Sequence, residues 1–312
     1  MLYSPAPMHL PDGFLSLAVS IICWVATVIL VGIAISRTDR SLGERQVPLM
    51  GIMAAFIFAA QMINFPVAGG TSGHLLGGAL AAITLGPWAG MLVMTAVIAV
   101  QGLLFQDGGL LVMGANILNM GLLTVMVGYG LYRSALGWNR TAKLAVIGVA
   151  AWLSVMTGAL FTSLEMWLSG TAKLELVLPA MLTVHALIGL GEALITVAAV
   201  AFILRTRPDL LGEGSASANA GRGWIGAGVL VALLVALISP LASANPDGLN
   251  RVAIDLGFIH TAQTGGGPFA GYSIPLLAST PLARILAGAL GIAAVLGVGL
   301  LIGRSLQRRH TD

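Results

Sequence analysis

The chain contains nine long apolar runs and too few charged residues to cover a soluble domain of its size. Charged residues make up 9% of its 312 residues, whereas soluble proteins average about 25%. Taking about 20 residues for a bilayer-spanning helix, the runs lie near 14–36, 46–64, 74–86, 87–105, 110–132, 143–167, 180–204, 224–242 and 281–303. This pattern predicts an all-α integral membrane protein. The short third run predicts a helix whose outer end is a packed loop, because bare backbone cannot face lipid.

The basic residues predict how these spans are oriented. Twelve of the fifteen Lys and Arg residues follow the first, fifth, seventh and ninth runs, and short cytoplasmic loops are enriched in Lys and Arg. The N-terminus is therefore expected outside and the C-terminus in the cytoplasm. His9, the 65–73 loop and the 106–109 turn then share the outer face. Since the basic residues lie in loops and form no stripe, we expect no nucleic-acid partner.

The sequence divides into two units joined by a polar segment. Residues 1–204 form a continuous block of seven spans. Residues 205–223 contain a Gly-, Ser-, Ala- and Asn-rich stretch that is typical of a flexible linker. Residues 224–312 hold two spans around an outer loop, roughly 243–280. We expect a seven-helix unit and a two-helix unit that are separate elsewhere and fused in this chain.

Few polar side chains lie inside the predicted spans. Gln101 ends the fourth run and Asn116 lies in the fifth, while His185 and Glu192 lie two helical turns apart in the seventh. Polar groups at this depth are often functional, but they also join helices by hydrogen bonds. For all four residues we favour the bonding role, and keep a role near a ligand as the alternative.

His9 and His74 are the strongest candidates for a metal site. They are two of only five histidines, and imidazole suits borderline-soft divalent metals. If Met8 is the first residue, its amine, the His9 amide and the His9 Nδ1 can close fused chelate rings around one ion. The fourth position of a planar nitrogen set is then open to a second imidazole. Such a set favours Ni²⁺ or Cu²⁺ and accommodates Co²⁺.

Several motifs resemble the CbiM/NikM substrate-capture subunits of cobalt and nickel energy-coupling-factor transporters, followed by their small CbiN/NikN-like, PDGLE-type companion subunit. The matching segments are residues 8–15, 71–75, 101–109, 114–116, 185–193 and, for the companion, 245–250. The resemblance implies a seven-helix capture domain into which the N-terminal segment inserts from outside. It also implies a multi-pass protein of a prokaryotic cell (inner) membrane that captures Co²⁺ or Ni²⁺ at the outer face for ATP-driven uptake. The choice between the two metals stays open.

The resemblance also implies ligands and partners. The metal would be held by the terminal amine and amide of the N-terminal segment and by two imidazoles, which are carried here by Met8, His9 and His74. A transmembrane coupling subunit and two ATP-binding subunits would drive uptake, and this sequence has no phosphate-loop motif of its own. We therefore expect a transporter subunit, not an enzyme, with no cofactor besides the transported ion. Six polar residues are candidates for orienting the ligands: Asp12, Ser72, Gln101, Asn116, His185 and Glu192.

Three further questions stay open in the sequence. Seven residues precede Met8 and would turn its amine into an amide, so we expect translation to start at Met8 or the extension to be removed. Asp12, in a Pro-Asp-Gly segment, is either a turn residue or a contact that fixes the His9 ring. Two other functions remain as alternatives: a proton-coupled secondary transporter that uses His185 and Glu192, and an intramembrane hydrolase built on Ser72 and His74, which has no evident third partner.

Overall fold

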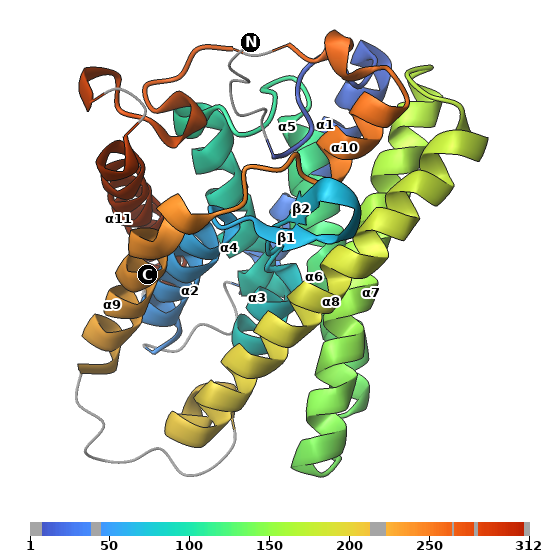
Figure 1. The fold of residues 1–312 in the computed structure, drawn as a ribbon. Helices are drawn as coiled ribbons and strands as arrows, with labels where there is room; N and C mark the ends of the chain where they lie inside the picture. The colour runs from blue at the N-terminus through green and yellow to red at the C-terminus, as the bar shows by residue number, and fades with distance from the viewer. Residues whose placement is uncertain (1–7, 39–44, 213–222, 264, 278–279, 309–312) are drawn as a thin grey trace.

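The protein is described here by a computed structural model, which covers residues 8–38, 45–212, 223–263, 265–277 and 280–308. The described chain is a bundle of helices with one small hairpin (Figure 1). The helices are α1 (Leu17–Thr38), α2 (Gln46–Gln61), α3 (Gly78–Leu85), α4 (Pro87–Val100), α5 (Met113–Asn116), α6 (Thr124–Ser134), α7 (Arg140–Leu168), α8 (Leu174–Thr206), α9 (Gly223–Ile238), α10 (Gly248–Asp255) and α11 (Pro281–Arg308). The strands β1 (Phe65–Val67) and β2 (Thr71–Gly73) pair antiparallel.

Each of the nine apolar runs contains a helix, as the hydropathy pattern predicts. Seven helical segments are long and apolar enough to cross a membrane, and α2 is a shorter apolar helix. The third run is helical only over the eight residues Gly78–Leu85. Its first residues, 74–77, continue from the hairpin without helical structure. The backbone there is buried in protein, which is the condition under which irregular backbone is tolerated at membrane depth.

Two π-helical turns interrupt the regular helices near the N-terminal segment. Gln101–Phe105 extends α4, and Ile117–Leu123 joins α5 to α6. A π turn inserts one extra residue per turn and re-aims the side chains beside it, and such turns are frequent at functional sites. Both of them lie next to residues that contact His9 or Leu10, as described below.

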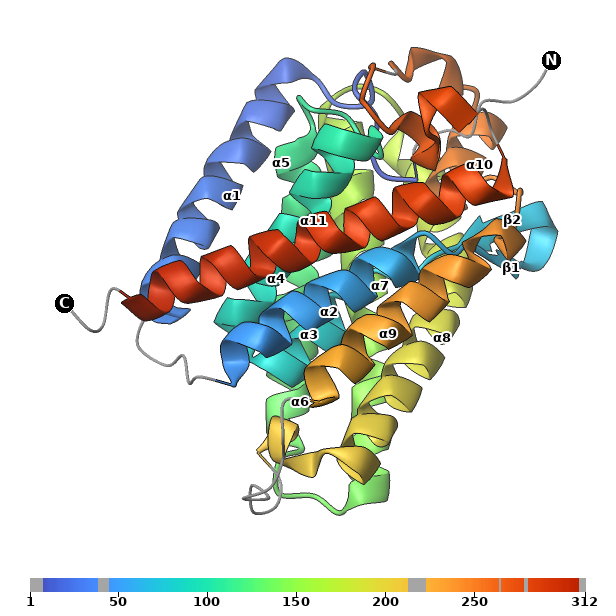
Figure 2. The same cartoon turned by 90° about the vertical axis from the view of Figure 1, so that its left-hand side faces the viewer.

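The second unit packs along the first through α9 and α11. These two helices lie on either side of α2, as Figure 2 shows. The close approach depends on small residues: a Cβ on Gly299 would lie 3.1 Å from the Cα of Gly51. Small residues at such positions let helix backbones approach closely where lipid offers no hydrophobic driving force.

One end of the bundle gathers four segments that are far apart in the sequence. They are the N-terminal segment, the hairpin, the loop that follows α4, and the 243–280 region with α10 (Figure 1). Backbone hydrogen bonds join the 243–280 region to two of the others. Ser72 N in the hairpin donates to Pro246 O, and Gln263 N donates to Asp12 O in the N-terminal segment. The predicted outer loop is thus a structured cover over the N-terminal segment.

The segment expected to be a linker is partly helical. α8 continues to Thr206, and Pro208–Leu211 forms a short 3₁₀ turn. Arg207 pairs with Asp209 there, at 2.8 Å. The Gly-, Ser- and Ala-rich part, residues 213–222, lies outside the described residues.

Candidate metal centre

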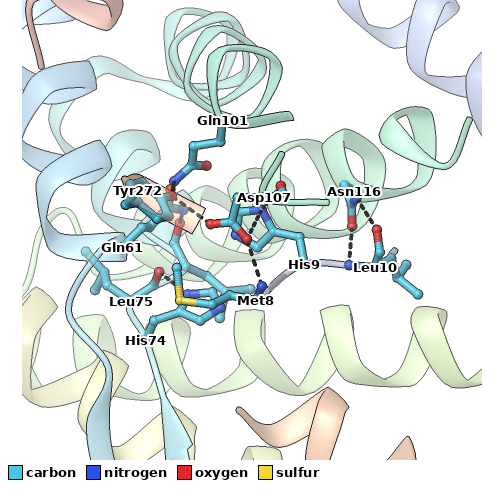
Figure 3. Close-up of polar contacts among 11 residues, drawn as sticks. Met8, His9, Leu10, Gln61, His74, Leu75, Gln101, Asp107, Asn116 and Tyr272 are labelled. Carbon is cyan, nitrogen blue, oxygen red and sulfur yellow. Dashed lines mark hydrogen bonds and ion pairs between the residues drawn. The ribbon is translucent and has the colours of Figure 1, made fainter. Parts of the chain in front are cut away.

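The fold brings His9 and His74 together. His9 lies in the extended segment before α1, and His74 directly follows β2. Their ring centroids are 5.4 Å apart and the rings are inclined by 62°. Only 1% of His9 and 8% of His74 is exposed. Two imidazoles are thus paired in the protein interior, next to each other in Figure 3.

Both rings present the hydrogen-bond pattern that is typical of metal-ligating histidines. Nδ1 of His9 lies 3.0 Å from the Asp107 carbonyl oxygen, and Nδ1 of His74 lies 2.9 Å from the Leu75 carbonyl oxygen. A neutral imidazole that donates from Nδ1 keeps a lone pair on Nε2, and ligating histidines are usually oriented by such a carbonyl contact. Nε2 of His9 is buried and has no hydrogen-bond partner among the described residues. It is therefore available to a cation.

The two rings line a small cavity of about 60 Å³. A space of this size has room for a divalent ion together with a few water molecules. Met8, Asn116, His185 and Asp247 contribute to the same lining. No cluster of three or more His, Cys, Asp or Glu side chains is arranged to hold a metal in the part of the chain that the structure describes. The two imidazoles would therefore need backbone nitrogens or water to complete a coordination shell.

Asp107 contacts both Met8 and His9 in the N-terminal segment. It was not among our sequence candidates. Its Oδ1 accepts a hydrogen bond from the Met8 nitrogen at 2.7 Å, while its carbonyl contacts His9. The neighbouring Gly108 has φ +108°, and a Cβ there would lie 3.1 Å from the Cβ of His9. Two sequence signals pointed to this residue: it is the acidic member of the predicted outer turn, and it lies in the 101–109 segment that carries the family resemblance.

Asn116 holds the backbone on the other side of His9. Its Oδ1 accepts from Leu10 N at 3.1 Å, and its Nδ2 donates to Leu10 O at 3.0 Å (Figure 3). A side-chain amide can satisfy both polar groups of one residue in this way. Asn116 therefore fixes the N-terminal segment inside the bundle, whereas the sequence favoured a bond between helices.

Asp12 contacts backbone, not the His9 ring. Its carboxylate accepts hydrogen bonds from the nitrogens of Leu110, Leu111 and Val112 at 2.9 to 3.1 Å. These amides precede α5, so Asp12 satisfies donors at a helix start that would otherwise lack partners. It anchors the N-terminal segment to the loop that also carries Asp107.

Two side chains hold the backbone around His74: the candidate Glu192, and Gln61, which was not among the candidates. Glu192 accepts from Leu76 N at 2.6 Å and from Gly77 N at 2.9 Å. Gln61 Nε2 donates to Leu76 O at 2.8 Å. Together they satisfy a buried backbone segment that forms no helix, and Gly77 turns it into α3 with φ +85°. Gly tolerates this left-handed conformation without strain.

The remaining candidates, Ser72, His185 and Gln101, lie around the histidine pair. The Ser72 hydroxyl donates to Asn245 O at 2.8 Å, and Nδ1 of His185 contacts Met181 O at 2.8 Å on its own helix. Gln101 Nε2 donates to the hydroxyl of Tyr272 at 3.3 Å. Ser72 and Gln101 thus connect the first unit to the second.

A second polar cluster is centred on Glu165, which was not among our sequence candidates. Glu165 of α7 accepts from Asn119 Nδ2 at 2.7 Å and from the Cys23 thiol at 3.3 Å. The signal was present as a lone carboxylate inside the sixth apolar run. Such residues usually find a partner in the bundle interior.

The second unit contributes side chains to the centre. Asp247 lines the small cavity and also a second cavity of about 490 Å³, and Met8 is the other residue common to both. These two residues therefore lie at the wall between the two spaces. Burial raises the pKa of the Asp247 carboxyl to about 8. Its carboxylate also accepts from Asn250 N at 2.8 Å and caps α10.

Comparison with known proteins finds two family matches in the chain. Residues 9–210 match the family CbiM, described as the cobalt uptake substrate-specific transmembrane region, and residues 222–308 match the PDGLE domain. A protein of Archaeoglobus fulgidus that carries the name of a fused nickel transport protein, NikMN, is 37% identical over 95% of this chain and 98% of its own. The fused nickel transport protein NikMN of Rhodobacter capsulatus is 30% identical over 97% of this chain and 99% of its own.

A solved structure shares the fold of the first unit. It is a crystal structure of a truncated transition metal transporter, 34% identical in sequence, with a TM-score of 0.58. The match covers 64% of this chain and 99% of that one.

Proposed function

The chain belongs to the CbiM family of cobalt uptake substrate-specific transmembrane regions, with a PDGLE domain behind it, and from this premise we propose that it captures Co²⁺ or Ni²⁺ for ATP-driven uptake. It is a multi-pass membrane component of cobalt or nickel transport. Capture takes place at the end of the bundle that carries the N-terminal segment, and this end faces outward. The N-terminus is then outside and the C-terminus cytoplasmic, in a prokaryotic inner membrane.

One observation carries the proposal: two buried imidazoles lie 5.4 Å apart beside a small cavity, and a ring nitrogen of His9 has no partner among the described residues. Leaving a buried polar atom without a hydrogen bond costs about 1–3 kcal/mol. A bound cation would remove that cost for the His9 nitrogen. The site is thus organised before metal arrives, which reduces the entropy lost on binding.

The ligands we propose are Met8, through its nitrogen, His9 and His74. In this structure Nδ1 of His9 faces the Asp107 carbonyl oxygen at 3.0 Å. Chelation through Nδ1 therefore requires this contact to open, whereas Nε2 can accept a metal without that change. A primary amine on Met8 would be the stronger donor, so we propose that the active protein starts at Met8. The intact mass of active protein tests this, and a mass that includes residues 1–7 would exclude it.

The two units divide the work in this proposal. Residues 1–204 form the capture domain, residues 205–223 the connecting segment and residues 224–312 the companion domain. A transmembrane coupling subunit and two ATP-binding subunits supply the energy. Relatives named for nickel and for cobalt transport support the cargo class but leave the choice of metal open.

A proton-coupled secondary transporter is the alternative function. Its expected relay residues, His185 and Glu192, both contact backbone groups in the structure, which supports a scaffold role. Uptake into vesicles that contain the partner subunits separates the two functions. Uptake should require ATP, and uptake that follows the proton gradient without ATP would favour the alternative.

Metal binding by the purified chain tests the site. His9→Ala and His74→Ala should each abolish high-affinity binding of Co²⁺ and Ni²⁺, because each removes one of the two imidazoles. His260→Ala is the matched control, since His260 is exposed in the 243–280 region. Metal content after exposure to a Co²⁺ and Ni²⁺ mixture would also identify the preferred ion. Undiminished binding by both site variants, as in the control, would overturn the assignment.

A further inference from the structure

We infer that Tyr272, in the second unit, is a positioning residue for metal capture by the first: its hydroxyl holds the Asp107 carboxylate that fixes the Met8 nitrogen beside His9. The inference rests on the proposed function and adds to it a residue that lies outside the capture domain. Besides Asp247, which lines the small cavity, it assigns the second unit a further side chain that acts on the metal centre.

A chain of short contacts connects Tyr272 to the ligands. The Tyr272 hydroxyl donates to Asp107 Oδ2 at 2.6 Å, and Asp107 Oδ1 accepts from the Met8 nitrogen at 2.7 Å (Figure 3). The Asp107 carbonyl contacts Nδ1 of His9. Tyr272 is 5% exposed and Asp107 3%. Hydrogen bonds to an ionised carboxylate are about twice as strong as neutral ones, and burial strengthens them further.

The phenol is oriented from several sides. Its ring stacks on Phe105 with centroids 5.0 Å apart and an angle of 25°, and it lies 6.2 Å from the ring of Phe58. Gln101 donates to the hydroxyl oxygen at 3.3 Å, which leaves the phenolic hydrogen for Asp107. Burial, followed by the charge of Asp107, raises the pKa of Tyr272 well above its usual value. The phenol therefore stays protonated and acts as the donor.

The backbone on both sides of this contact is strained. Gln106, next to Asp107, has φ +56°, and Tyr272 has φ +55°. They are the two residues other than glycine with positive φ among the described residues. A side chain in this region persists only when its surroundings over-determine it, and such strain concentrates at functional sites.

The two strained segments are also joined directly. Phe269 N donates to Leu104 O at 2.9 Å, and a Cβ on Gly267 would lie 2.6 Å from Cγ of Gln106. The 265–272 segment therefore lies on the loop that carries Asp107. Tyr272, at the end of this segment, contacts Asp107 from there.

Ni²⁺ binding to the full-length protein tests the inference. Tyr272→Phe keeps the stacked ring and removes only the hydroxyl. We expect Ni²⁺ affinity to fall about 10-fold, since removing a group that orients a metal ligand typically costs 10- to 100-fold. In the metal-free protein, hydrogen exchange of residues 8–12 and 106–112 should become faster. Tyr129→Phe is the control: it removes the hydroxyl of a half-buried tyrosine in α6 and should leave both measurements unchanged.

A double-mutant cycle separates positioning from general packing. In an Asp107→Asn background, Tyr272→Phe should cause little further loss, because the charged acceptor is already gone. Equal losses in both backgrounds would show that Tyr272 does not act through Asp107 and would overturn the inference. If Y272F does not fold, D107N tests the same contact from the other side. Wild-type affinity and exchange in D107N would also overturn it.

The outcomes distinguish the inference from the proposed function. If the unsubstituted chain binds Ni²⁺ and His9→Ala does not, the proposed function stands. Wild-type binding and exchange by Y272F would then overturn the inference alone. If the unsubstituted chain binds no Ni²⁺, the proposed function fails and the inference falls with it.

Discussion

The carboxylate of Glu192 lies 2.6 Å from the backbone nitrogen of Leu76, the second residue after His74. The contact joins the middle of α8 to a segment that no helix stabilises. Because the same carboxylate also accepts from Gly77 N, it determines where that segment leaves the hairpin. The position of His74 therefore depends on a side chain 118 residues further along the printed sequence.

Glu192→Gln should weaken metal binding and lower stability together. Glutamine has one acceptor oxygen, so its amide group would face a backbone N–H and one donor would lose its partner. We expect a loss of about 1–3 kcal/mol in the free energy of unfolding and several-fold weaker Ni²⁺ binding. Thermal unfolding in detergent and calorimetric titration measure the two effects. Glu175→Gln, at an exposed position of the same helix, is the control. Equal behaviour of both variants would show that the Glu192 carboxylate does not hold the backbone after His74.

Gly108→Ala should disrupt the centre without removing a polar group. The added Cβ would lie 2.8 Å from Nδ2 of Asn116 and 3.1 Å from the Cβ of His9, in a backbone conformation that alanine avoids. We expect a loss of about 1–3 kcal/mol from backbone strain and displacement of His9, seen as a large loss of Ni²⁺ affinity. A Cβ on Gly266 meets nothing within 4 Å, so Gly266→Ala is the control. Normal Ni²⁺ affinity in G108A would show that His9 tolerates movement.

Asp12→Ala should release the N-terminal segment from α5. Three backbone amides would lose their acceptor, and loss of such a cap costs about 0.5–2 kcal/mol. We expect faster proteolysis between residues 8 and 16, and weaker metal binding as a consequence. Asp255→Ala removes an exposed carboxylate from the end of α10 and serves as the comparison. Protection of the segment in D12A equal to that in D255A would contradict the anchoring role.

Asp247 should make the stability of the metal-free protein depend on pH. Burial raises its pKa to about 8, against about 3.9 in an unfolded chain. Between these values the folded protein holds a proton that the unfolded chain has lost. The contribution of the neutral carboxyl is therefore complete below pH of about 4 and is lost as pH rises toward 8. Asp247→Asn can still cap α10 but carries no charge, so its unfolding temperature should fall less across this range. Parallel pH profiles for the two proteins would exclude Asp247 as the cause.

The sequence predicted the helices well because hydropathy and length are local properties. All nine apolar runs contain helices, yet the π-helical turns at Gln101–Phe105 and Ile117–Leu123 were not anticipated. Such turns depend on side-chain contacts across the bundle. Local periodicity cannot show them, since a π turn and an α turn can have the same composition.

The sequence predicted only part of the candidate centre, because contacts between distant segments leave no local pattern. His9 and His74 stood out as rare polar residues on one face, and the structure brings their rings together. Asp107 and Tyr272 did not stand out, because their importance lies in a contact between segments 165 residues apart. Asp12 and Asn116 were on the candidate set, but their partners are backbone groups of distant segments, which no sequence motif names.

The buried thiol of Cys23, beside Glu165, makes the protein suitable for site-specific cysteine labelling. Cys23 is the single cysteine of the chain and is shielded from solvent. Water-soluble maleimides should therefore leave the native protein unlabelled. A cysteine placed at Ser243 or at Arg205 would then be the sole reactive position in an otherwise unmodified protein. Labelling by a reagent that cannot cross the bilayer would then show on which side of the membrane each end of the bundle lies, without labelling of Cys23.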